Sequence, residues 1–244
     1  MTMSLHMIEL LPDMPALMRF LRGQGLATAD GDDDLGYGVH AWLAAAFGEL
    51  APKPWRLFAD RKRPPRLLAY TIHDADLLRG RLREFADPAV CAVCPDADVS
   101  LSAKRMPDWQ PGRRLGFEVQ CCPVGRENRS GVEKDLALLH GDGSEEERHD
   151  RHQIYCEWAR TRLEGSGAAT VSSIAVEGFR LVSQRRRASR QPGGRQITRL
   201  IRPQVLLRGT WTVDNTDAFS QLLATGIGRH RAFGYGMVLL RPPA

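Results

Sequence analysis

The same order of secondary structure is predicted twice along this chain of 244 residues. Segments with strand character and segments with helical spacing follow one another as strand, helix, strand, strand, helix, strand before residues 107–112, and in the same order after them. Two prolines and a glycine in residues 107–112 are typical of a linker. This order is that of the ferredoxin-like unit. The sequence therefore predicts an α+β protein with two tandem ferredoxin-like (RRM-like) βαββαβ domains, residues 1–108 and 113–244.

Strand and helix boundaries follow from apolar periodicity and from capping residues. In the first half, we expect strands at residues 5–10, 55–58, 66–72 and 99–106, and helices at residues 14–21, 35–50 and 74–85. In the second half, we expect strands at residues 115–121, 171–182, 197–213 and 237–240, and helices at residues 147–164 and 216–224. Residues 125–146 are polar and are expected to form an insertion. The residues expected to cap helices are Asp32 to Asp34, Asp74, and Asp214 or Asn215.

Composition narrows the class of protein. An apolar content of 43% supports a packed core, and a net charge of +5 with a pI near 9.2 favours an acidic partner. No apolar run reaches membrane-spanning length and no signal pattern begins the chain, so we expect a cytoplasmic protein without membrane association. Five irregularly spaced cysteines argue against a disulfide framework, and Cys91 and Cys94 have no second pair to complete a zinc site. We expect no metal and no cofactor.

A glycine-rich segment, residues 226–236, lies near the end of the chain. Its glycines can adopt positive φ and approach a ligand closely; they are Gly226, Gly228, Gly234 and Gly236. Its cationic residues, Arg229, His230 and Arg231, suit a polyanion. A flexible turn with solvated arginines explains the same pattern equally well. A dinucleotide fingerprint does not fit, because there the glycines follow a strand and open a helix.

Arginines accumulate between Glu177 and Asp214, a span without any carboxylate. They stand at positions 180, 185, 186, 187, 190, 195, 199, 202 and 208. Residues 185–195 also contain Pro192, Gly193 and Gly194, which predicts a hairpin loop. A solvated loop is the ordinary meaning of such a run, but uncompensated arginines repel one another unless an anion lies alongside. The candidate nucleic-acid contacts are Arg185, Arg186, Arg187, Arg190, Arg195 and Arg199, with a smaller patch at Arg61 and Lys62.

Tyr37 and His40 form the candidate catalytic pair. On a helix the two side chains lie roughly 60° apart. Gly36 and Gly38 predict that the regular helix starts later, which leaves the pair near its N-terminus, where the helix dipole disfavours an imidazolium. A boundary histidine bonded to backbone is the structural alternative. Other histidines compete less well: His149 and His152 lie in an acidic stretch, His73 ends a strand, and His230 is expected to contact phosphate.

The glycine-rich segment, read as Gly-Ile-Gly, a basic tip and Ala-Phe-Gly-Tyr-Gly before a final strand, resembles the glycine-rich loop of the RAMP superfamily of CRISPR proteins. The chain is most similar to the CasE-like repeat-RNA endoribonucleases, which have tandem ferredoxin-like domains and a Tyr-x-x-His on the first long helix. Tyr37 and His40 match that pattern. Type I-E and type IV systems both carry such proteins, and the sequence does not separate them.

The resemblance implies metal-independent cleavage of CRISPR precursor RNA at the repeat hairpin. His40 would act as general acid or base and Tyr37 would orient the phosphate or support the attacking hydroxyl, giving a 2′,3′-cyclic phosphate. The partners implied are the repeat hairpin RNA, retained afterwards as crRNA, and other subunits of an effector complex. One alternative is a non-catalytic hairpin-RNA-binding subunit with the same fold. Another, a general RNA-binding protein, lacks the aromatic sheet pattern of RRM modules.

Overall fold

The computed structural model describes residues 4–26, 35–60, 62–127, 131–140, 147–187 and 197–243. It divides into two compact units. The first comprises Met1–Pro107 and Ala232–Gly234, and the second comprises Asp108–Arg231 and Tyr235–Ala244. The ranges predicted from sequence placed residues 232–234 in the second domain, whereas the structure groups them with the first unit.

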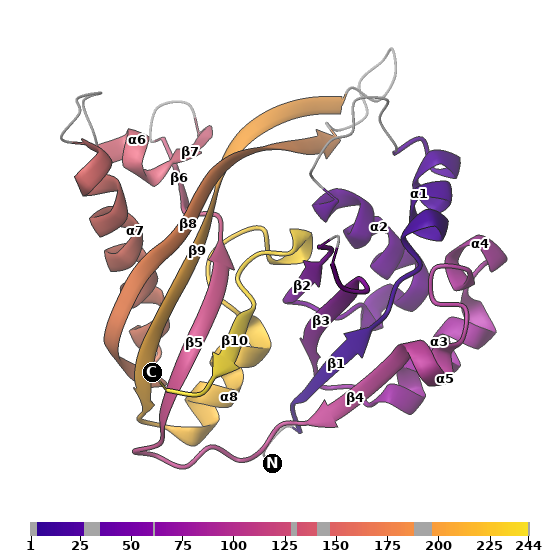
Figure 1. Cartoon of the computed structure of the whole chain (residues 1–244), viewed down its shortest axis with the longest axis horizontal. Helices are drawn as coiled ribbons and strands as arrows, with labels where there is room; N and C mark the ends of the chain where they lie inside the picture. The colour runs from indigo at the N-terminus through magenta and orange to yellow at the C-terminus, as the bar shows by residue number, and fades with distance from the viewer. Residues whose placement is uncertain are drawn as a thin grey trace. The chain divides into compact units, whose positions relative to one another are not determined.

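The first unit is a four-stranded antiparallel sheet with helices on one face (Figure 1). Its elements are β1 (His6–Leu10), α1 (Met14–Gly23), α2 (Gly36–Phe47), a 3-10 turn (Gly48–Leu50), β2 (Trp55–Phe58), β3 (Arg66–Thr71), α3 (Ala75–Phe85), α4 (Pro88–Cys91), α5 (Ala97–Ser100) and β4 (Leu101–Arg105). The strand order is β2-β3-β1-β4, so the first strand lies between the third and the fourth. This is the ferredoxin-like arrangement.

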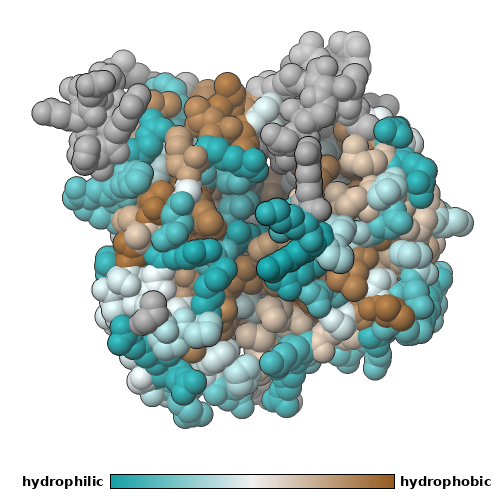
Figure 2. Space-filling view, viewed as in Figure 1, coloured by the Kyte–Doolittle hydropathy of each residue, from teal (hydrophilic) through white to brown (hydrophobic). Residues whose placement is uncertain are grey.

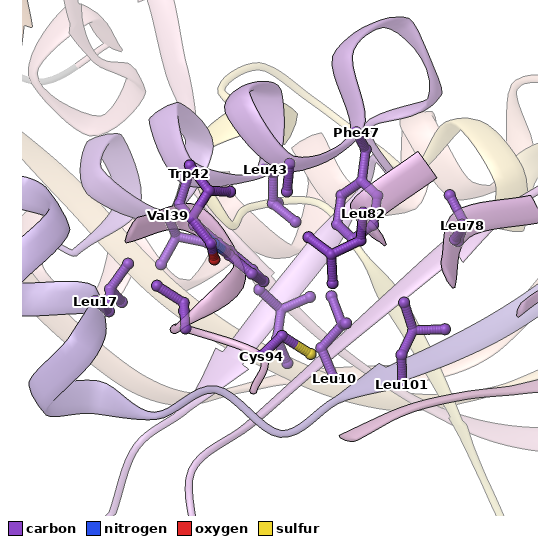
Figure 3. Packing of buried hydrophobic residues seen from close by; sticks show 14 of the residues in the cluster. Leu10, Leu17, Val39, Trp42, Leu43, Phe47, Leu78, Leu82, Cys94 and Leu101 are labelled. Atoms are coloured by element: carbon purple, nitrogen blue, oxygen red, sulfur yellow. The ribbon is translucent and has the colours of Figure 1, made fainter. Parts of the chain in front are cut away.

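The core of the first unit lies between this sheet and helices α1 to α4 (Figure 3). Trp42 and Phe47 of α2 are fully buried beside strand residues such as Leu10 and Leu101. Helix α2 also approaches α1 closely, because a Cβ on Gly38 would lie only 2.6 Å from Leu21 Cδ1. The close contact between the two helices explains why the helix contains a glycine that lowers its intrinsic propensity.

The second unit repeats the architecture with longer strands (Figure 1). Its elements are β5 (Arg114–Cys121), β6 (Val124–Arg126), β7 (Glu133–Asp135), α6 (Leu136–His140), α7 (Glu147–Glu164), β8 (Ala169–Arg187), β9 (Ile197–Val213), α8 (Thr216–Thr225) and β10 (Val238–Arg241). Its four-stranded sheet has the order β10-β5-β9-β8, again with the first strand between the third and the fourth, and β6 and β7 form a separate two-stranded sheet. The predicted α+β fold with two ferredoxin-like units is therefore confirmed.

Several local predictions need correction. Helix α2 starts at Gly36, earlier than its glycines suggested, and Leu35 occupies the N-cap position without a side-chain cap. The acidic residues 32–34 lie outside the described residues. Strand β4 starts later than expected because α4 and α5 occupy the preceding segment. The sequence predicts Ile154, Trp158 and Leu163 as core residues of α7. In the described part of α7, the fully buried residues are Tyr155, Ala159 and Leu163, so Leu163 is confirmed, whereas Ile154 and Trp158 are half-buried.

Strands β8 and β9 form a long curved ribbon that extends past the end of β5 (Figure 1). Hydrophobic side chains gather on the surface over this ribbon (Figure 2). Leu181 and Ile201 are 58% and 69% exposed there, a feature that the alternation in the sequence did not indicate. In the part of the chain that the structure describes, no helix has the length and apolarity needed to cross a membrane.

Candidate active site and nucleic-acid interface

Tyr37 and His40 lie in the first turns of α2, at the edge of the face that packs into the core. Their neighbours Val39 and Trp42 are buried, each 1% exposed, whereas Tyr37 and His40 are half-buried. The helical spacing of the apolar residues predicts His40 at the edge of the buried face and Tyr37 just beyond it, and the structure agrees. Each of the two side chains is packed on one side and reachable on the other.

A third ring joins this pair. The ring centroids of His40 and Phe233 are 5.1 Å apart at an interplanar angle of 74°, an edge-to-face contact. Phe233 stacks on Tyr37 with centroids 6.1 Å apart at 16°, and Tyr37 and His40 are themselves 6.5 Å apart at 69°. Both arrangements are those that aromatic pairs prefer. Phe233 was not among the predicted site residues.

The segment that carries Phe233 is fixed on both sides by Trp55 of β2. The Trp55 Nε1–H donates a hydrogen bond of 3.1 Å to the backbone oxygen of Ala232. Gly234 has a φ of 87°, and a Cβ there would lie 2.8 Å from Trp55 Cζ3. Trp55 is itself buried, so it provides a rigid support. Residues 232–234 thus complete the first unit around Tyr37 and His40.

The environment of His40 favours a neutral imidazole. Burial, and after it the positive charge of Lys53, lowers the pKa of His40 below its ordinary value of 6.5. The sequence predicted this direction but ascribed it to the helix dipole, whereas the causes identified here are burial and a nearby cation. A neutral imidazole near pH 7 can accept a proton, and the exposed Lys53 offers a positive charge beside it.

A family model described as "CRISPR associated protein" matches residues 6–242. The chain belongs to this CRISPR-associated protein family. Among curated protein sequences, no match was found.

Solved structures show which fold this CRISPR-associated protein shares. CRISPR endoribonuclease Cse3 bound to a 19-nucleotide RNA superposes with a TM-score of 0.60 at 18% identity, over 98% of this chain and 100% of that one. Thermus thermophilus Cse3 bound to an RNA representing a pre-cleavage complex gives a TM-score of 0.56 at 19% identity, over 98% and 100%. A chain of a CRISPR RNA-guided surveillance complex, pre-nicking, gives 0.50 at 16% identity, over 97% and 99%. At these identities the likeness establishes the fold.

In this CRISPR-associated protein, the glycine-rich segment is packed against its own chain. Gly226, Gly228, Gly234 and Gly236 all have positive φ, as predicted. A Cβ on Gly228 would lie 2.9 Å from the ring of Trp158. Close packing against Trp158, and against Trp55 in the case of Gly234, therefore explains why glycine stands at these two positions. A direct contact of their backbone with RNA stays a prediction.

Two of the cationic residues of this segment are paired with a carboxylate on β7. Arg229 Nη1 lies 2.5 Å from Glu133 Oε1, and His230 Nε2 lies 3.1 Å from Glu133 Oε2. Arg202 Nη1 donates to the backbone oxygen of Glu133 at 2.9 Å. Burial, the largest influence, keeps the pKa of His230 below its ordinary value although Glu133 acts in the opposite direction. Arg229 and His230 were predicted as RNA contacts, and in the structure both side chains contact Glu133. The third predicted contact of this segment, Arg231, donates a hydrogen bond from Nη1 to the backbone oxygen of Thr225.

Replacing Glu133 with glutamine is expected to lower the free energy of unfolding by about 1 to 3 kcal/mol, because the guanidinium groups of Arg229 and Arg202 lose their charged partner. Burial acts to raise the pKa of Glu133, but the hydrogen bond from Arg229 and the nearby positive charges lower it below 4.5. The stabilisation is therefore present above about pH 4.5 and is lost as the pH falls through the lowered pKa. Urea unfolding should show a wild-type advantage that is full above about pH 5 and shrinks as the pH falls below 4.5.

Glu127→Gln is the matched control, because Glu127 pairs with Lys134 at 2.6 Å in a more exposed position. It should cost less than about 1 kcal/mol. Equal losses in the two variants would contradict a special role for Glu133.

The predicted arginine contacts fall mainly at the distal end of the β8–β9 ribbon. Arg185, Arg186 and Arg187 end β8, and Arg199 lies near the start of β9 with its backbone opposite Arg185. Arg61, Arg190 and Arg195 lie outside the described residues. Lys62 is in an exposed turn, where its backbone N–H donates to Asp60 Oδ1 at 2.6 Å.

The interpretation that all nine arginines are uncompensated is wrong for two of them. Arg208 Nε lies 2.8 Å from Glu118 Oε2 on β5, and Arg202 contacts Glu133. The carboxylates come from distant parts of the sequence, so the local run did not reveal them. The distal arginines of the ribbon remain the candidates for RNA.

The cysteines take part in packing in the part of the chain that is described. Cys91 Sγ donates to the Leu82 oxygen at 3.4 Å, and Cys94 Sγ lies 3.0 Å from Ser100 Oγ. All five thiols are free, as expected. Among the described residues, no group of three or more His, Cys, Asp or Glu side chains is placed to hold a metal ion.

Proposed function

We propose that this protein is a metal-independent endoribonuclease that cuts CRISPR precursor RNA at the repeat hairpin. The observation that carries the proposal is the half-buried His40, with its lowered pKa, next to Tyr37 on α2 and near the cation of Lys53. The pair matches the Tyr-x-x-His of CasE-like enzymes in spacing and element. The likeness in fold to Cse3 structures that contain RNA supports the same reading.

The chemistry uses the RNA's own 2′-hydroxyl. The 2′-oxygen attacks the adjacent phosphorus, the bond from phosphorus to the 5′-oxygen breaks, and the products are a 2′,3′-cyclic phosphate and a 5′-hydroxyl. His40 accepts the 2′-hydroxyl proton or donates a proton to the departing 5′-oxygen. Tyr37 orients the phosphate or supports the hydroxyl. Lys53 offsets the negative charge that builds on the phosphoryl oxygens.

Binding is assigned to the arginines of the second unit. A-form RNA hides its bases in a deep, narrow major groove, so an arginine hairpin reads groove shape and phosphates. The backbones of Arg185 and Arg199 are paired in the ribbon, and arginines that are close together in a chain repel one another unless an anion lies alongside. We propose that the hairpin RNA supplies that anion and stays bound after cleavage. A surveillance-complex chain with this fold supports a place among other subunits.

The proposal is tested by incubating candidate repeat RNAs with the protein in EDTA and mapping the product ends. Cleavage at one position beside the hairpin is expected at the same rate with EDTA as with Mg²⁺, leaving a 2′,3′-cyclic phosphate. A 2′-deoxy substitution at the cleaved nucleotide should abolish the reaction, because the nucleophile is absent. Loss of cleavage in EDTA, or cleavage of the deoxy substrate, would count against this chemistry.

A further inference from the structure

Phe233 contacts both members of the candidate catalytic pair, although it lies at the opposite end of the chain. Its ring meets His40 edge to face at a centroid distance of 5.1 Å and stacks on Tyr37 at 6.1 Å. We propose that Phe233 is a positioning residue of the active site, which fixes the orientation of the His40 imidazole and the Tyr37 phenol and keeps water from one side of His40. For its effect on rate, this inference rests on the proposed function; for its effect on His40 it does not.

The backbone around Phe233 is built to hold the ring in place. The hydrogen bond from Trp55 Nε1 fixes Ala232 on one side, and the approach of Gly234 to the Trp55 ring fixes the other. Neither support involves the Phe233 side chain. Phe233 is itself only half-buried, so shortening its side chain removes the ring from the site without removing the anchor. This separates a positioning role from a general role in folding.

A fixed ring has two consequences for His40. Reacting groups must be held within a fraction of an ångström, and a misplacement of about 1 Å can cost about a hundredfold in rate. Burial is also the largest cause of the lowered His40 pKa, and Phe233 is one of the side chains that bury it. The charged group that acts on His40 from the adjoining loop is Lys53, and the titratable group on its own helix is Tyr37. Neither of these is altered when Phe233 is replaced.

The experiment compares Phe233→Ala, Phe233→Leu and Phe233→Tyr with the unmodified full chain. The His40 pKa is measured by NMR titration without RNA, and the cleavage rate is measured at saturating hairpin RNA. We expect Phe233→Ala to raise the His40 pKa towards 6.5 and to slow cleavage about tenfold to a hundredfold. The dissociation constant for RNA should change less than about twofold. Phe233→Tyr, which keeps the ring, should have the His40 pKa and the cleavage rate of the unmodified protein. Phe233→Leu should give values between those of Phe233→Tyr and Phe233→Ala.

Phe85→Ala is the matched control, because Phe85 ends α3 in the same unit and is 66% exposed. It should leave the His40 pKa and the rate unchanged. If His40→Ala stops cleavage while Phe233→Ala changes neither the His40 pKa nor the rate, the positioning role is overturned. A loss of RNA affinity with an unchanged rate at saturation would also overturn it, since Phe233 would then be an RNA contact. If Phe233→Ala shifts the His40 pKa while His40→Ala still cleaves, the effect of Phe233 on His40 stands, whereas the proposed function and the effect of Phe233 on the rate both fail.

Discussion

Replacing His40 with alanine is expected to slow cleavage of a repeat hairpin RNA by about a hundredfold to ten-thousandfold, the usual contribution of a positioned general acid or base. The dissociation constant for the same RNA should change little, because most of the proposed RNA-binding residues belong to the second unit and none of them is altered. The measurement is a single-turnover rate at saturating RNA, with affinity determined separately. Retained binding with lost cleavage would also separate the enzyme from the alternative, a non-catalytic RNA-binding subunit.

The pH dependence gives an independent view of the same residue. Because the pKa of His40 lies below 6.5, the imidazole is neutral over the physiological range. If His40 acts as the base, the wild-type rate should fall at low pH with a midpoint below pH 6.5, as the imidazole becomes protonated. His152→Ala is the control, since His152 is exposed on α7. Unchanged cleavage by His40→Ala would place the active site elsewhere.

The helix boundaries that were predicted correctly depend on residues that are close together in the sequence. Asp74 accepts a hydrogen bond from Leu77 N–H at the start of α3, and Asn215 accepts one from Ala218 N–H at the start of α8. Both caps could be predicted because a capping side chain and its backbone partner are three residues apart. The register of the sheets, by contrast, joins segments that are distant in sequence. The order of elements predicted the ferredoxin-like topology, but it did not predict this register.

The parts of the site that were missed depend on distant contacts. Tyr37 and His40 were predicted as the catalytic pair because their i, i+3 spacing on one helix matches the Tyr-x-x-His of the family that the chain resembles. Phe233 carries no local signal of its partnership with His40, since an aromatic residue in a glycine-rich segment fits many environments. Glu133 likewise gave no sign that it pairs with Arg229, because the two residues come from separate elements. Side-chain pairs of this kind become visible only in the folded chain.

Gly236→Ala is expected to lower the free energy of unfolding by about 3 kcal/mol in the absence of RNA. Gly236 has a φ of 77°, and a Cβ there would lie 2.1 Å from the Ile227 backbone oxygen. That carbonyl cannot move aside easily. Ile227 is buried and its N–H donates to the Gly236 oxygen at 2.9 Å, while the Gly236 N–H donates to the Gln120 oxygen at 2.7 Å. The measurement is urea unfolding of the protein alone.

Gly112→Ala is the matched control, because Gly112 also has positive φ, 82°, but a Cβ there would meet nothing within 4 Å. It should cost only the conformational strain, about 1 kcal/mol. The comparison distinguishes two roles for Gly236, close packing within the fold and backbone contact with RNA. If Gly236 serves the fold, the alanine variant is less stable before RNA is added, and its cleavage declines because the segment is displaced. If instead Gly236 serves only as a backbone contact for RNA, the variant should be as stable as the Gly112 control and should lose only its affinity for RNA. That result would contradict close packing against Ile227 as the reason for this glycine.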